Sequence, residues 1–74
     1  MEKQILNSEI LGEIIREARK EQNLTQAELA GMSGTGNRLI SDLERGKKTA
    51  EIGRVLQVLA ALGISLYAIS KWKK

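Results

Sequence analysis

The residues best suited to chemistry in this chain lie close together between positions 36 and 42. If the stretch is helical, Arg38, Ser41 and Asp42 fall at i, i+3 and i+4 and share one face. An arginine fork can donate two hydrogen bonds to O6 and N7 of guanine, and an asparagine amide such as that of Asn37 can pair in the same way with adenine. The alternative is a solvated face with an Arg38–Asp42 salt bridge. The candidates for base contact are Gly36, Asn37, Arg38, Ser41 and Asp42.

A second set of polar residues flanks this stretch and suits the phosphate backbone of DNA. Gln26 is the first residue of an expected helix, where its amide and the unpaired helical N–H groups can meet a phosphate. Arg45, Lys47 and Lys48 follow the base-contacting candidates and supply positive charge. The alternatives are an exposed helix former at Gln26 and a polar linker at the two lysines. The expected phosphate contacts are Gln26, Arg45, Lys47 and Lys48.

The composition argues against an enzyme. The 74 residues contain no histidine or cysteine and therefore lack the usual general base, zinc ligands and thiol nucleophile. The nine carboxylates are scattered, and Gly34 and Gly36 follow an expected helix rather than a strand, unlike a dinucleotide fingerprint. We expect no catalytic residues, metal or cofactor. A net charge of +3 leans toward polyanionic partners.

Residues 25–46 carry the signals of two short helices joined by a turn. Thr25 and Glu28 have the spacing of a capping box. A break containing Gly34 and Gly36 separates this first helix from a second one, with Gly46 as its stop signal. Two short helices with a glycine-bearing turn outline a DNA-binding helix-turn-helix.

Two further helices and two terminal segments complete a single domain, 1–74. Residues 1–7 form an N-terminal arm or a frayed tail. Asn7 or Ser8 caps a helix over about residues 9–21, whose apolar residues follow helical periodicity. Thr49 is the expected cap of a fourth helix that ends at Gly63. The predicted fold class is all-α, a bundle of four main helices.

Residues 64–70 alternate with period two and predict a strand instead of a helix. A lone strand leaves backbone groups without partners, and pairing with the same strand of a second copy across a two-fold axis solves this. The spare apolar flank of the fourth helix would complete the interface, and residues 71–74 would form a basic tail. The expected interface residues of this homodimer are Val58, Ile64, Leu66, Tyr67, Ala68 and Ile69.

The longest apolar run, Val58–Leu62, is too short to cross a bilayer, and the N-terminus lacks a signal-peptide core. The sequence therefore predicts a cytoplasmic protein without a membrane partner. Attachment to a membrane surface through residues 64–74 is disfavoured, since that segment has strand periodicity.

Two stretches resemble the lambda-repressor-like (XRE-type) helix-turn-helix family: LTQAELA at Leu24–Ala30 and ISDLERGKKTAEIGRVLQVLAALGI at Ile40–Ile64. The similarity covers about residues 9–69 and is greatest to the HipB-like branch, which comprises antitoxins and autorepressors. The resemblance implies a phosphate contact by Gln26, base contacts from the second helix of the motif, and a buried ion pair between Arg19 and Glu44. It also implies dimers that pair a C-terminal strand.

This family resemblance implies a repressor that binds an inverted-repeat operator in double-stranded DNA and regulates its own promoter. It would be nucleoid-associated in a bacterial cytoplasm, with a HipA-like toxin kinase as a further partner. The chain departs from the family at Thr35, where an apolar residue is usual, and at Gly36, where a serine or threonine caps the helix. The rival hypothesis is a protein-interaction module with the same fold that has lost DNA binding.

Overall fold

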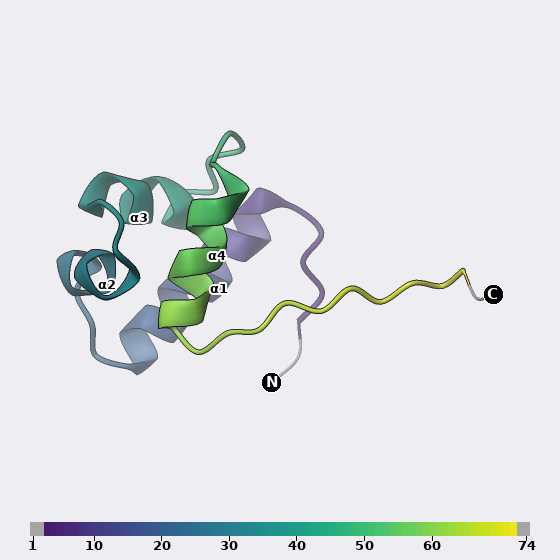
Figure 1. Cartoon of the computed structure of the whole chain (residues 1–74), viewed down its shortest axis with the longest axis horizontal. Coiled ribbons are helices and arrows are strands. Elements are labelled where there is room, and N and C mark those ends of the chain that lie inside the picture. The colour runs from purple at the N-terminus through teal and green to yellow at the C-terminus, as the bar shows by residue number, and fades with distance from the viewer. Residues whose placement is uncertain (1–2, 73–74) are drawn as a thin grey trace.

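The computed structural model describes residues 3–72 and folds them into four α-helices joined by short connections. These are α1 (Ser8–Glu21), α2 (Gln26–Ser33), α3 (Asn37–Glu44) and α4 (Ile52–Ala61). Figure 1 shows the helices gathered in one bundle, from which the C-terminal segment extends away. The predicted all-helical class is confirmed. Met1 and Glu2 of the expected arm, and Lys73 and Lys74 of the expected tail, lie outside the described residues.

The helices begin largely where their capping residues predict. The Asn7 side chain accepts a hydrogen bond of 2.8 Å from the Ile10 N–H at the start of α1. At α2, the expected reciprocal bonds between Thr25 and Glu28 are both present. The prediction of Thr49 as the cap of α4 is wrong, because the helix starts two residues later, with Glu51 in the cap position. Glu51 makes no side-chain capping bond and instead pairs with Arg54 in the first turn.

A single apolar core fills the bundle. Helix α3 packs against both α1 and α2, and α4 packs against α2. The largest fully buried side chains are Ile15, Leu29, Ile40, Val58 and Leu59. Val58 was expected to face a second copy, yet its exposure is 0%. The flank of α4 that looked spare in the sequence is buried in the core of its own chain, so Val58 is not available for a dimer interface.

Two glycines allow α1 to lie close to the end of α3. A Cβ atom added at Gly12 would clash with the carbonyl oxygen of Leu43. Gly46 has φ +81°, and a Cβ atom there would lie 3.0 Å from the Glu9 backbone. The Ser8 hydroxyl donates a hydrogen bond of 2.9 Å to the Gly46 carbonyl. The N-terminal half of α1 thereby holds the C-terminal end of α3 in place.

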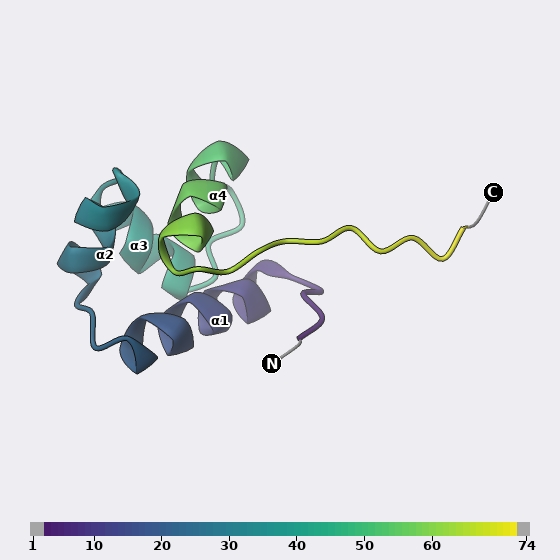
Figure 2. The same ribbon diagram turned by 60° about the horizontal axis from the view of Figure 1, so that its bottom comes forward.

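The chain leaves the bundle after α4. Gly63 has φ +76°, and the Ile64 N–H closes the helix by donating to the Leu59 carbonyl at 2.9 Å. Beyond it, residues 65–69 make no backbone hydrogen bond within the described part of the chain. Figures 1 and 2 show this segment projecting past the helices. Residues 3–72 of the isolated chain contain no strand, so the predicted strand and its pairing remain a prediction.

Candidate nucleic-acid interface

The turn between α2 and α3 sets the direction of α3 relative to α2. Gly34 ends α2 in the left-handed conformation with φ +70°, and the Thr35 N–H donates to the Ala30 carbonyl at 3.0 Å. This is the hydrogen-bonding pattern of a glycine-capped helix end. Gly36 then serves as the N-cap of α3 without a side-chain bond, and its carbonyl accepts from Leu39 and Ile40.

Thr35 is anchored by a polar contact in place of the apolar one usual in the family. The Ser33 hydroxyl is buried and donates to the Leu29 carbonyl at 2.9 Å. The Thr35 hydroxyl lies 2.8 Å from the Ser33 oxygen and is only partly exposed. Because the serine proton is used on Leu29, threonine is the donor between the two hydroxyls. The turn therefore keeps a side-chain anchor despite its unusual sequence.

The leading end of α3 is open to solvent. Gly36, Asn37 and Arg38 are all exposed, whereas Ile40 and Leu43 on the opposite side of the helix are buried. Among the described residues, Arg38 enters no salt bridge, so the alternative Arg38–Asp42 pair is not formed. The two side chains best suited to base recognition thus lie at the start of a helix whose other face is fixed in the core.

Asp42 and Ser41 have different surroundings from those the sequence led us to expect. The Asp42 side chain is 12% exposed and forms ion pairs with Arg45 and Lys47. Its backbone carbonyl accepts a bond of 3.0 Å from the Lys47 N–H. Ser41 is half-buried and accepts a hydrogen bond from Arg45. Asp42 therefore organises the cations that follow α3 and does not present a free carboxylate to a base.

The expected ion pair between Arg19 and Glu44 is present and doubly bonded. Arg19 Nε lies 2.6 Å from Glu44 Oε2, and Arg19 Nη2 donates to Oε1 at 3.0 Å. The side chains are 11% and 5% exposed. Burial by itself raises the pKa of Glu44, but hydrogen bonds from Arg19 and Gln26 and the charges of Arg19 and Arg16 bring that pKa below its ordinary value. The pair joins α1 to the end of α3.

The candidate phosphate contacts lie at two places around this core. Gln26 begins α2 and donates a hydrogen bond from Nε2 to Glu44 Oε1 at 3.1 Å. Arg45, Lys47 and Lys48 are exposed in the connection between α3 and α4, and the first two are held by Asp42. All the DNA-contact candidates therefore belong to α2, to α3 with the turn before it, or to the loop directly after α3.

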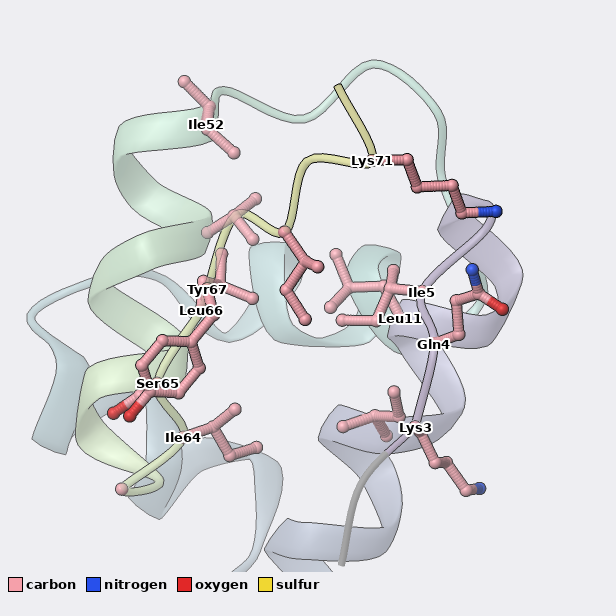
Figure 3. Close-up of a pocket in the computed structure, with 14 residues that line it drawn as sticks. Lys3, Gln4, Ile5, Leu11, Ile52, Ile64, Ser65, Leu66, Tyr67 and Lys71 are labelled. Atoms are coloured by element: carbon pink, nitrogen blue, oxygen red, sulfur yellow. The ribbon is translucent and has the colours of Figure 1, made fainter. Parts of the chain in front are cut away.

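Apart from Val58, which is in the core, most residues expected in a dimer interface lie along an open groove between α1, α4 and the two terminal segments. Figure 3 shows Ile5 of the N-terminal segment and Leu11 of α1 on one side, and Ile52, Ile64 and Leu66 on the other. Tyr67 and Ile69 also line the groove, while Ala68 is exposed without lining it. The groove has a volume of about 1290 Å³, above the range of roughly 300–1,000 Å³ for small-molecule pockets. Its lining is mainly apolar, and its polar residues Lys3, Gln4, Ser65 and Lys71 come from the terminal segments.

Two features that support the interface are not among the expectations from the sequence. One is the close approach at Gly12, which a glycine inside a strong helical pattern could have signalled. The other is the Ser33 hydroxyl, whose spacing to Thr35 carries no recognisable signal before the turn is built.

No group of residues suited to hold a metal ion occurs within residues 3–72, and no helix there is long and apolar enough to cross a membrane.

Two short helices joined by a glycine turn, with an exposed polar start to the second, define a helix-turn-helix domain of the kind that binds DNA. A family model described as helix-turn-helix matches residues 15–69, and the chain belongs to this XRE-type family. It is 56% identical over 66 residues to the uncharacterized HTH-type transcriptional regulator y4mF of Sinorhizobium fredii, covering 89% of this chain and 87% of the relative. A second regulator of that organism, y4dJ, is 32% identical over 56 residues, 76% of this chain and 73% of its own length. These relatives are transcriptional regulators, consistent with the expectation of a protein that is not an enzyme.

Solved structures share the fold. A HipA-HipB-O2-O3 complex contains a chain with a TM-score of 0.85 and 21% identity, covering 96% of this chain and 100% of that one. The same values hold for a HipB-O4 20mer complex. The restriction-modification controller protein C.AhdI from Aeromonas hydrophila has a TM-score of 0.70 at 29% identity, over 78% of this chain and 84% of its own. The chain is thus a helix-turn-helix regulator whose fold matches that of HipB.

Proposed function

We propose that this protein is a homodimeric, sequence-specific repressor that binds an inverted-repeat operator. The observation that carries the proposal is the exposed start of α3, where Asn37 and Arg38 stand on a helix whose far side is buried. In helix-turn-helix dimers the second helices enter successive major grooves about 34 Å apart. Two copies related by a two-fold axis would meet that requirement on a palindromic site.

Base and phosphate contacts have separate roles in this proposal. Arg38 reads guanine and Asn37 reads adenine, while Gly36 lets the backbone approach the DNA because it has no side chain. Ser41 lies one turn further and contacts a base edge. Asp42 is withdrawn from the base contacts, since its carboxylate is occupied by Arg45 and Lys47. Gln26, Arg45, Lys47 and Lys48 bind phosphates and fix the protein on the duplex.

Residues 64–70 provide the proposed dimer contact. Their backbone groups between 65 and 69 have no partner in the described chain, and Tyr67 and Ile69 are 85% and 90% exposed. Pairing with the same segment of a second copy would satisfy these groups and bury the side chains. Ile64, Leu66, Tyr67, Ala68 and Ile69 make this interface; Val58 does not.

Two finer roles follow from the likeness to HipB. HipB is found in a complex with HipA in one neighbouring structure and in a complex with an O4 20mer in another. We propose that this chain represses its own promoter in a bacterial cytoplasm, where it associates with the nucleoid when bound. We also propose a HipA-like toxin kinase as its partner. Co-purification with a kinase encoded next to it would support this role, and failure to bind any neighbouring gene product would leave only the repressor.

The decisive experiment is selection of bound fragments from genomic DNA, followed by titration of the selected site with Arg38→Ala, Gln26→Ala and Gln57→Ala variants. Arg38→Ala should remove preference at one base position at a cost of about 1–3 kcal/mol. Gln26→Ala should weaken specific and non-specific DNA alike. Gln57→Ala, an exposed and uncharged position on α4, serves as the control. Absence of binding at low salt would overturn the repressor and favour the interaction module; binding without sequence preference would overturn the base contacts.

A further inference from the structure

We infer that Glu44 is a positioning residue for DNA binding, because it holds the Gln26 amide at the phosphate-facing start of α2. The inference rests on the proposed DNA-binding function and assigns Glu44 a role beyond its ion pair with Arg19. It links the α1–α3 ion pair to a side chain proposed to contact DNA.

The Glu44 carboxylate is shared by two donors from different elements. Oε2 is bonded to Arg19 Nε at 2.6 Å, whereas Oε1 accepts from both Arg19 Nη2 at 3.0 Å and Gln26 Nε2 at 3.1 Å. The carboxylate is 5% exposed, so water competes little for these bonds. Arg19 fixes the carboxylate, and the carboxylate in turn fixes the amide.

The same network sets the start of α2. Arg19 Nη1 donates to the Leu24 carbonyl at 2.8 Å, directly before the Thr25 cap. The capping box uses the N–H groups of Thr25 and Glu28. Within the described residues, the N–H groups of Gln26 and Ala27 donate to no backbone carbonyl. One hydrogen of the Gln26 amide points to Glu44, which leaves the second for a phosphate beside these N–H groups.

This arrangement lowers the entropic cost of the phosphate contact. A glutamine side chain that is free in solution loses rotamer freedom when it binds, whereas an amide already held by Glu44 has lost most of it on folding. The amide also separates the carboxylate from the phosphate, so that two anions are bridged by one donor group. Glu44 itself does not touch DNA.

A double-mutant cycle tests the role of Glu44, with Gln26→Ala, Glu44→Asp and the double variant titrated against the selected operator and against non-specific DNA. Glu44→Asp keeps the negative charge for Arg19 but is one methylene shorter and withdraws from Gln26. Gln26→Ala should lower the affinity for both DNAs about tenfold. Glu44→Asp should weaken them roughly threefold or more in the natural background and have no further effect beside Gln26→Ala. Gln57→Ala on α4 is the matched control.

The outcomes separate the two hypotheses. If Glu44 had only a structural role, Glu44→Asp would lower DNA affinity by the same factor in the natural chain and beside Gln26→Ala. That result would overturn the inference. A natural chain without DNA affinity would overturn the proposed function as well. If Glu44→Asp does not fold, the NMR order parameter of the Gln26 side-chain amide in the free natural chain decides. A value above about 0.6 supports a held amide, and a lower value overturns the inference.

Discussion

The helical body (α1–α4 with their connections) and the C-terminal segment after Gly63 differ in where their hydrogen-bond and packing partners lie. In the body, every buried side-chain nitrogen and oxygen of the described residues has a hydrogen-bond partner. In the segment after Gly63, the backbone of residues 65–69 has no hydrogen-bond partner within residues 3–72, and Tyr67 is 85% exposed. The body is therefore specified by contacts within one chain, while the segment is proposed to acquire its structure from a second copy. Substitutions should change folding in the first region and association in the second.

The largest effect should come from the buried ion pair. Arg19→Ala leaves the Glu44 carboxylate without its partner in a site where it is 5% exposed. Loss of one member of a buried pair costs about 3–5 kcal/mol, close to the whole stability of a small domain. We expect the variant to be largely unfolded by circular dichroism at 25 °C. Arg54→Ala, which removes an exposed pair with Glu51, should unfold like the natural chain; equal loss in both variants would contradict this.

A smaller loss of stability is expected from a substitution where α1 contacts α3. Gly12→Ala introduces a methyl group that clashes with the Leu43 carbonyl, and such overpacking costs about 1–3 kcal/mol. Gly31→Ala is a matched control, because nothing lies within 4 Å of the added atom on α2. That change should raise the free energy of unfolding by roughly 0.5–1 kcal/mol. Urea denaturation of both variants measures the difference in free energy of unfolding. A Gly12→Ala variant as stable as the natural chain would show that α1 and α3 can move apart at no cost.

Acid should weaken the body through Glu44. The pKa of this carboxyl is lowered in the folded chain, so the unfolded chain takes up a proton first, near its ordinary value of 4.5. The stabilisation is fully present above that pH and is lost as the pH falls through the lower pKa of the folded chain. Urea denaturation between pH 6 and pH 3 should show this decline. Glu44→Gln, if folded, should flatten it; an unchanged slope would exclude Glu44 as its source.

The smallest effect on folding, and the clearest on association, is expected from the segment. Leu66→Asp alters a residue that is 46% exposed, so the stability of a single chain should change by less than about 0.5 kcal/mol. In a dimer the added charge would be buried without a partner. Sedimentation should therefore shift from dimer to monomer, and DNA binding should lose its steep concentration dependence. A dimer that survives this change would place the interface elsewhere.

Much of the motif could be predicted because its signals are local. The capping box at Thr25 and Glu28 and the glycine stops depend on residues a few positions apart, and the structure contains them. The alternation of residues 64–70 predicts a strand for an equally local reason, but a strand forms only with a partner, which residues 3–72 of a single chain do not provide. The start of α4 at Ile52, with Glu51 as its N-cap, differs from the predicted start because Thr49 has the stronger local capping preference.

The sequence by itself determined the number of helices, the position of the turn and the family of this protein, since periodicity and capping act over one or two turns of chain. Only the tertiary structure decided that Val58 is core, that Asp42 binds Arg45 and Lys47, and that Glu44 holds Gln26 as well as Arg19. Those roles depend on which faces of separate helices meet. The pattern of polar and apolar residues in the sequence is the same whether a side chain contacts water, another helix or a second molecule.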